Sequence, residues 1–144
     1  MRLEFKRLDP DAPLPGYAKE GDAGLDLSAG TDVVVEPGER ALVPTGLAVA
    51  IPPGHAGLVL PRSGLASRQG LTLANAPGLI DPGYRGEVTI AVVNLDRDDP
   101  VKIARGDRIA QLLLVPFRAV EPVAVDELPE TSRGSGGFGS SGVR

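Results

Sequence analysis

A carboxylate and an aromatic ring lie close together in residues 75–87, which read Asn-Ala-Pro-Gly-Leu-Ile-Asp-Pro-Gly-Tyr-Arg-Gly-Glu. The Asp-Pro-Gly triplet at 81–83 is typical of a tight turn, because proline presets φ and glycine accepts a positive φ. From Glu87 the chain continues Val-Thr-Ile-Ala-Val-Val, a strong strand pattern. We therefore predict a β-hairpin that starts with the strand at 71–74 and whose stiff bend could position Asp81 as a general base beside Tyr84. The alternative is that the acid only initiates a turn and the ring only packs.

Two further segments join arginine to polar neighbours and indicate anion binding. Arg62, Ser63 and Gly64 open the only convincing helical turn of the body, at residues 63–70. Backbone amides and the helix dipole favour an anion there, and a guanidinium group offers phosphate a pair of donors. The alternative is an ordinary N-cap at Ser63 beside a surface arginine, with Gly70 just past the helix end.

Arg108 and Gln111 open the last long strand pattern. Strict alternation would place Gln111 on one face with Ile109, and Arg108 on the other. A charged turn before a core strand is the alternative. Asp22 and Asp26 lie four residues apart in an extended pattern, so they should share a face and could hold a hydrated cation, although most such pairs are simply solvated.

The end of the chain, residues 133–142, is rich in glycine and serine and contains a Gly-x-Gly-x-x-Gly pattern. It is a weak dinucleotide fingerprint, because no strand precedes it and too little chain follows. The segment does offer backbone amides, the cation of Arg133 and the ring of Phe138. Such a tail could close over a nucleotide with the ring on the base, and a disordered tail is the alternative.

The elements that must position these residues are short strands. The chain has 144 residues with 19 glycines, 14 prolines and 42% apolar residues, a composition that favours many strands and turns over disorder. We predict an all-β sandwich, barrel or jelly roll with one short helix. The expected units are a β domain at 1–128 and a flexible tail at 129–144. Strands are expected at 3–8, 22–27, 33–35, 40–43, 47–51, 57–60, 71–74, 87–93, 101–104, 109–117 and 123–125.

Composition excludes several functions. The absence of cysteine removes disulfides, thiolate zinc sites and thiol nucleophiles. With a single histidine, His55, a transition-metal site is not expected, whereas Mg²⁺ held by oxygen ligands and by a substrate fits the composition. The net charge of −4 argues against general nucleic-acid binding. No apolar run approaches the ~20 residues of a membrane span, and the N-terminus lacks an apolar signal core, so we expect a cytoplasmic protein without a membrane partner.

Taken together, five segments resemble in order and spacing the motifs of the trimeric dUTP diphosphatase (dUTPase) family, across nearly the whole chain. They are Asp22–Leu27, Pro61–Ala66, Gly78–Glu87, Gly106–Leu112 and Arg133–Gly142. The resemblance implies a jelly-roll subunit, a homotrimer with active sites where subunits meet, and dUTP as substrate. It implies water attack at the α-phosphorus to give dUMP and pyrophosphate, with Mg²⁺ on the triphosphate. Such an enzyme keeps uracil out of DNA and supplies dUMP for thymidylate synthesis.

The resemblance also assigns roles to single residues. Asp81 would deprotonate the attacking water, with Gln111 and Ser63 as further catalytic residues. Tyr84 would exclude a 2′-hydroxyl, and Asp26 would contact Mg²⁺ through water. The uracil and deoxyribose would meet Asn75, Gly78, Leu79, Ile80, Asp81, Tyr84, Thr89, Phe138 and Gly139. The phosphates would meet Arg62, Ser63, Gly64, Arg108, Gln111 and Arg133.

Two rival functions use the same fold. A dCTP deaminase, or a bifunctional relative, would need a catalytic glutamate near the base, for which Glu87 is the only obvious candidate. A catalytically inactive nucleotide-binding regulator is the second rival. The intact Asp81, Tyr84 and Phe138 favour hydrolysis of dUTP.

Overall fold

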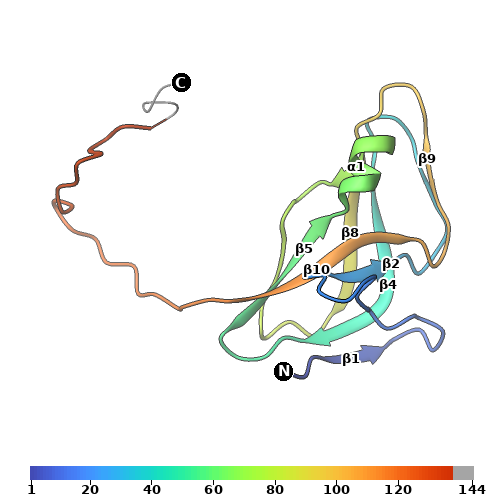
Figure 1. The fold of residues 1–144 in the computed structure, drawn as a ribbon, viewed down its shortest axis with the longest axis horizontal. Helices are drawn as coiled ribbons and strands as arrows, with labels where there is room; N and C mark the ends of the chain where they lie inside the picture. Colours follow the sequence, from blue (N-terminus) through green and yellow to red (C-terminus); the bar gives the residue numbers. More distant parts are fainter. Residues whose placement is uncertain (138–144) are drawn as a thin grey trace.

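The computed structural model describes residues 1–137, so Phe138 and Gly139 lie outside the described residues. Ten strands and one helix follow one another in this part of the chain (Figure 1). No helix within residues 1–137 is both long enough and apolar enough to cross a membrane. The elements are β1 (Glu4–Arg7), β2 (Leu25–Ser28), β3 (Val33–Val35), β4 (Arg40–Ala50), β5 (His55–Pro61), α1 (Ser63–Gln69), β6 (Leu71–Leu73), β7 (Gly78–Ile80), β8 (Glu87–Asn94), β9 (Val101–Ile103) and β10 (Arg108–Pro116).

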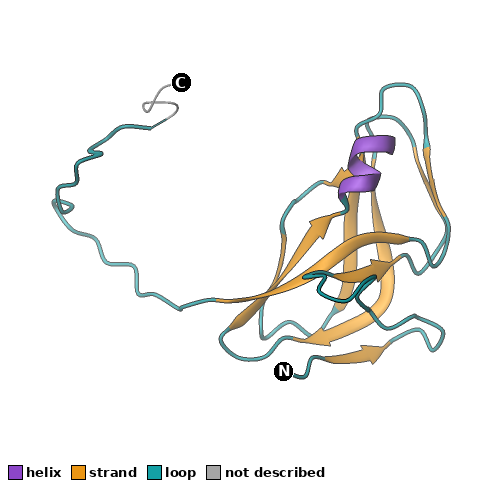
Figure 2. Ribbon diagram, viewed as in Figure 1, coloured by secondary structure: helices purple, strands orange, loops and turns teal. Residues whose placement is uncertain are grey.

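The strands form two four-stranded antiparallel sheets and one two-stranded sheet, with α1 at one end (Figure 2). The first sheet has the order β1-β4-β8-β6, the second β2-β10-β5-β7, and β3 pairs with β9. Both large sheets contribute to one core, Val43 and Ile90 from the first, Leu27 and Leu112 from the second. Burying each such side chain stabilises the fold by about 1.5–3 kcal/mol. The predicted all-β fold with one short helix is confirmed.

One strand replaces the two expected at 40–43 and 47–51. β4 runs through both segments, and its pairing with β8 shifts register between Pro44 and Ala48. Two features of this bulge keep the chain in the same sheet. Gly46 takes a φ of 71°, and the hydroxyl of the buried Thr45 donates to the Val88 carbonyl at 2.6 Å. The prediction was wrong because a proline and a glycine end a strand by local rules, whereas a bulge satisfies the same residues without ending it.

The predicted hairpin is confirmed in its two arms, because β6 pairs antiparallel with β8, but the 75–87 segment is more than a simple tip between them. β7 pairs with β5 in the second sheet, whereas β8 pairs with β4 and β6 in the first. The 75–87 segment therefore crosses from one sheet to the other. Burial accompanies this pairing, because Gly78 and Ile80 are buried on β7 and Ile80 joins the core from the second sheet. β7 and β8 therefore stay apart, and a cavity lies between them.

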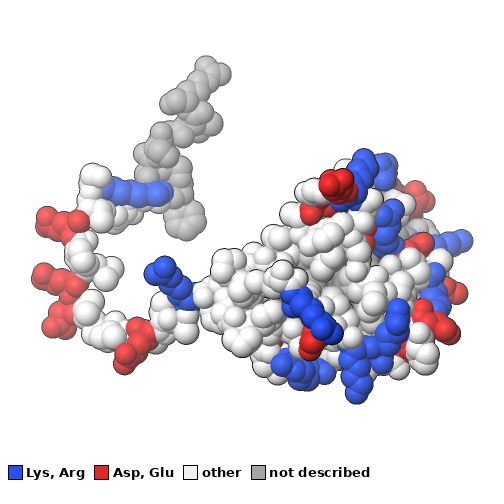
Figure 3. Space-filling view, turned by 60° about the horizontal axis from the view of Figure 1, so that its bottom comes forward, with Lys and Arg blue, Asp and Glu red and all other residues white. Residues whose placement is uncertain are grey.

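After β10 the chain leaves the body of the molecule (Figure 1). Residues 117–137 contain no strand, so the strand expected at 123–125 is absent. Val123 is 71% exposed and Val125 60% exposed, so neither side chain gains the burial that would favour pairing. Figure 3 shows acidic side chains spaced along this segment. The domain boundary at residue 128 stays a prediction.

Candidate active site

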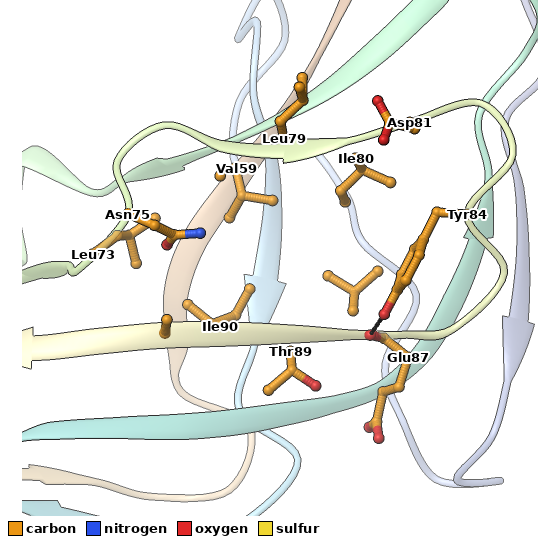
Figure 4. A pocket seen from close by; sticks show the side chains of 13 residues that line it. Val59, Leu73, Asn75, Leu79, Ile80, Asp81, Tyr84, Glu87, Thr89 and Ile90 are labelled. Carbon is orange, nitrogen blue, oxygen red and sulfur yellow. Dashed lines mark hydrogen bonds between the residues drawn. The ribbon is translucent and has the colours of Figure 1, made fainter.

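A cavity of about 290 Å³ lies between β7 and β8. Figure 4 shows Asn75 at one end, pointing into the space between the strands, and Tyr84 closing the other end. Ile80 turns into the cavity and Asp81 projects to the opposite side of β7 (Figure 4). The lining is mainly aliphatic with a few polar groups, the usual make-up of a small-molecule site. We call it the base cavity, and its lining residues are Val59, Leu73, Asn75, Gly78, Leu79, Ile80, Asp81, Tyr84, Glu87, Val88, Thr89, Ile90 and Ala91.

The bend that carries the acid and the ring is fixed by two hydrogen bonds. The Tyr84 amide donates to the Asp81 carbonyl at 3.1 Å, which confirms the predicted turn. The Tyr84 hydroxyl donates to the Glu87 carbonyl at 2.8 Å. Asp81 itself is exposed, so its carboxylate is open to water. The turn therefore carries, within four residues, a solvent-accessible carboxylate at Asp81 and an aromatic ring of fixed orientation at Tyr84.

Gly78 lines the base cavity without a side chain that would fill it. A Cβ atom at this position would lie 3.3 Å from the Val59 Cβ and 3.5 Å from the Asn75 Nδ2. A side chain there would press on Val59 and touch the amide that points into the cavity. The glycine therefore leaves the backbone of β7 and the Asn75 amide both accessible to a planar ligand.

A second cavity of about 330 Å³ lies beside α1. We call its lining residues, together with the adjoining Arg108, the phosphate cluster. Asp26 is its centre, with a side chain only 13% exposed. Its Oδ1 lies 3.3 Å from Arg62 Nε, and its Oδ2 accepts Arg108 Nη1 at 2.9 Å. Arg62 also donates to the Arg108 carbonyl at 2.8 Å. The other lining residues are Ala18, Asp22, Ala23, Gly24, Ser63, Gly64, Leu65, Arg68 and Gln111.

A bulge in β10 brings Arg108 and Gln111 to the same cluster. The pairing of β10 with β2 shifts register between Arg108 and Ala110, so Ile109 and Ala110 are both buried. Gln111 lines the cavity and donates to the Pro61 carbonyl at 3.0 Å, while Arg108 reaches Asp26. The predicted strict alternation was wrong, because an extra residue in a bulge resets the facing of all that follow.

Two details of the helix and of the acidic pair also differ from the prediction. The N-cap of α1 is Arg62 rather than Ser63, and no side chain caps the helix. Gly70 follows the helix with a φ of 67°, as predicted. Asp22 lies in a turn, where it accepts the Lys19 amide at 2.8 Å, and only Asp26 lies in a strand. The two acids still line one cavity, because the chain folds back rather than running straight.

Arg68 belongs to the phosphate cluster, although the sequence patterns did not select it. It follows Gly64 by four residues, so the two share a face of α1. A Cβ atom on Gly64 would lie 2.9 Å from the Arg68 Nη2. Arg62 and Arg108 share the carboxylate of Asp26, whereas Arg68 has no ion pair within residues 1–137. Its spacing from the motif glycine was the one sequence signal that could have found it.

The structure brings the predicted residues together in two groups. Apart from Phe138 and Gly139, which lie outside the described residues, those expected at the base and sugar line the base cavity, and those expected at the phosphates, except Arg133, form the phosphate cluster. The two cavities have no lining residue in common. Arg133 belongs to neither group, and its Nε donates to the Gly136 carbonyl at 3.0 Å in the segment beyond β10.

A family model described as dUTPase matches residues 10–142. This chain belongs to the dUTPase family. It is 56% identical to a deoxyuridine 5'-triphosphate nucleotidohydrolase of Thermobifida fusca, over 99% of this chain and 79% of that protein. The identity to the enzyme of the same name from Mycolicibacterium gilvum is 58%, over 97% of this chain and 94% of the relative.

Solved dUTPase structures superpose closely on this member of the family. A Staphylococcus bacteriophage 80alpha dUTPase with dUPNHPP has a TM-score of 0.92 and 35% identity, over 99% of both chains. A mutant dUTPase from phage phi11 of S. aureus has a TM-score of 0.83 and 30% identity, over 90% of this chain and 100% of that one. That phi11 structure is described as revealing the coordination of a structural Mg(II) ion.

Replacing Arg68 by glutamine should weaken the binding of inorganic triphosphate about tenfold, because a hydrogen bond to a charged group contributes about 1.5–3 kcal/mol. Calorimetric titration of the full chain measures this loss. Arg97→Gln, in the loop between β8 and β9, removes the same charge outside the cluster and should bind as the parent protein does. An equal loss in both variants would mean that only net charge matters.

Proposed function

We propose that this dUTPase hydrolyses dUTP at sites built between copies of the chain, with Asp81 as the general base. As a family member, the chain is a dUTP nucleotidohydrolase that releases dUMP and pyrophosphate. The observation that carries the proposed site is that the base cavity and the phosphate cluster are two cavities with no lining residue in common. One nucleotide needs both kinds of group, so the base cavity of one copy would meet the phosphate cluster of another.

The exposure of Asp81 supports its role. Its carboxylate projects from the turn on the side away from the aliphatic lining, where both water and a second copy can reach it (Figure 4). The water oxygen attacks the α-phosphorus as its proton passes to Asp81. The bond from the α-phosphorus to the bridging oxygen breaks, and pyrophosphate leaves with the electron pair. Catalysis then comes mainly from a positioned base and from charge neutralisation.

The base cavity suits uracil and deoxyribose. The Asn75 amide and the backbone of residues 78–80 would pair with the edge of the base, and Thr89 would add a main-chain contact. A site that hydrogen-bonds one base edge rejects a wrong edge strongly, because the wrong edge leaves buried groups unpaired. The ring of Tyr84, held at the end of the cavity by its bond to the Glu87 carbonyl, would occupy the space that a 2′-hydroxyl needs.

The phosphate cluster suits the triphosphate, with Arg62, Arg108 and Arg68 as cations and Ser63 and Gln111 as neutral donors. We place three such clusters in a homotrimer, one per subunit interface. The predicted tail at 129–144 would close this site, with Arg133 on the γ-phosphate and Phe138 and Gly139 over the base. We expect the enzyme in the cytoplasm.

The residues present fit a magnesium ion carried by the substrate. Within residues 1–137, no three His, Asp or Glu side chains come together as a metal site. Both oxygens of Asp26 already face arginines, so this carboxylate suits a contact through water better than direct ligation. The triphosphate would hold Mg²⁺, and the ion would supply neutralisation of the phosphate charge.

An assay of pyrophosphate release with Mg²⁺, over dUTP and the four common deoxynucleoside triphosphates, tests the function. We expect release from dUTP alone. Ammonia from dCTP would establish the deaminase instead, and dUTP binding without any product would establish an inactive regulator.

Asp81→Asn should keep dUTP affinity while turnover falls by about two to four orders of magnitude, because the amide cannot accept the proton of the water. Steady-state kinetics and binding of a non-hydrolysable analogue measure the two quantities. Unchanged turnover would refute the assigned role. Asp98→Asn, in the loop between β8 and β9, is the matched control and should behave as the parent protein.

Mixing two inactive variants tests the shared site. Asp81→Asn and Arg62→Gln, denatured together and refolded, should regain activity, because some sites would combine the intact acid of one copy with the intact arginine of another. Random assembly at equal amounts restores about a quarter of the sites. Each variant refolded alone is the control. No gain on mixing would place both groups of a site in one chain.

A further inference from the structure

Glu87, the last residue of the motif segment Gly78–Glu87, connects the turn to a distant strand. Its carbonyl accepts the Tyr84 hydroxyl at 2.8 Å. Its carboxylate Oε1 accepts the amide of Gly46 at 2.7 Å, across 41 residues of sequence. One half-buried residue at the start of β8 thus links the sugar-facing ring to the bulge of β4.

The bulge is a firm anchor for this link. The Gly46 carbonyl accepts the Leu8 amide at 2.8 Å and the Asp9 amide at 3.1 Å. A Cβ atom on Gly46 would lie 2.8 Å from the Asp9 Cβ and 3.0 Å from the Ala12 Cβ, so the backbone is enclosed on this side. Next to it, the buried Thr45 hydroxyl donates to the Val88 carbonyl at 2.6 Å, directly beyond Glu87. The start of β8 is therefore held to the bulge by a side chain on each strand.

The tyrosine ring depends on this link for its position. Tyr84 is 45% exposed, and within residues 1–137 the Glu87 carbonyl is the one polar partner of its hydroxyl. A Cβ atom on Gly86 would lie 2.5 Å from the Tyr84 Oη, so the ring lies against bare backbone. Packing on one side and one hydrogen bond at the tip define the orientation. A shift of the carbonyl of Glu87 would move the tip of the ring with it.

We infer that Glu87 is a positioning residue for sugar discrimination, acting through Tyr84. Its carboxylate fixes the start of β8 against Gly46, and its carbonyl then holds the ring where a 2′-hydroxyl would have to sit. The carboxylate of Glu87 already accepts the Gly46 amide. A dCTP deaminase would instead need this acid free beside the nucleobase. The inference rests on the proposed function, because it requires the deoxyribose to lie against Tyr84.

The test compares kcat/KM for dUTP with kcat/KM for UTP in four variants. Glu87→Leu removes the acceptor at similar size and should lower the dUTP preference about tenfold, by the loss of one hydrogen bond to a charged group. Glu87→Gln keeps an acceptor oxygen and should retain the preference. Tyr84→Phe, which lacks the hydroxyl, should lose preference as Glu87→Leu does. The double variant Tyr84→Phe with Glu87→Leu should lose no more than either alone, because both act on one link.

A merely structural glutamate would give a different result. Thermal stability would fall in Glu87→Leu while the preference for dUTP stayed at the parent value, and this outcome would overturn the inference. Equal loss of preference in Glu87→Gln and Glu87→Leu would overturn it as well. If Glu87→Leu does not fold, Glu87→Asp, whose shorter arm leaves Gly46 unreached, takes its place with the same expectation. If the parent protein fails to hydrolyse dUTP, the proposed function fails before any variant is compared.

Discussion

The functional architecture depends on one constraint, that the 75–87 segment joins strands in two different sheets. Ile80 must reach the core from β7, and Ile90 must reach it from β8. The two strands do not pair with each other, and the cavity between them is lined mainly by aliphatic side chains. Asp81 and Tyr84 lie at the bend between the two strands, where one faces water and the other closes the cavity (Figure 4).

Charge balance governs the second half of the site. A single, mostly buried carboxylate, Asp26, pairs with two arginines that come from β10 and from the residue before α1. Alone, each long arginine side chain would lose conformational entropy on being fixed, with no ion pair to offset that cost. Sharing one carboxylate keeps both guanidinium groups in place and leaves a net positive charge. Arg68 adds to that charge. A preorganised cationic cluster of this kind stabilises phosphate oxygens without a large rearrangement on binding.

Two linked sets of hydrogen bonds hold the base cavity in shape. Backbone bonds at the turn fix Tyr84, and Glu87 with Thr45 fixes the start of β8 to the bulge of β4. In both sets a side chain forms a hydrogen bond with a backbone group at a point where regular strand pairing is interrupted. Without these side chains, the irregular strand would leave backbone groups unpaired. The irregular positions of the sheets are therefore the ones that support the site.

The sequence by itself determined the all-β class, the turn at Asp81, the end of the helix at Gly70 and the five motifs that place the chain in its family. These depend on local preferences, since proline, glycine and strand-forming residues act over a few neighbours. Only the tertiary structure decided which strands pair, that β4 is continuous, that a bulge brings Arg108 and Gln111 together, and that Glu87 reaches Gly46. Pairing and register are set by how the whole chain shares one core, and a single residue inserted in a strand reverses every facing after it. For that reason most residues of the candidate site could be predicted from the motifs, whereas the position of Arg68 beside them and their division into two cavities could not.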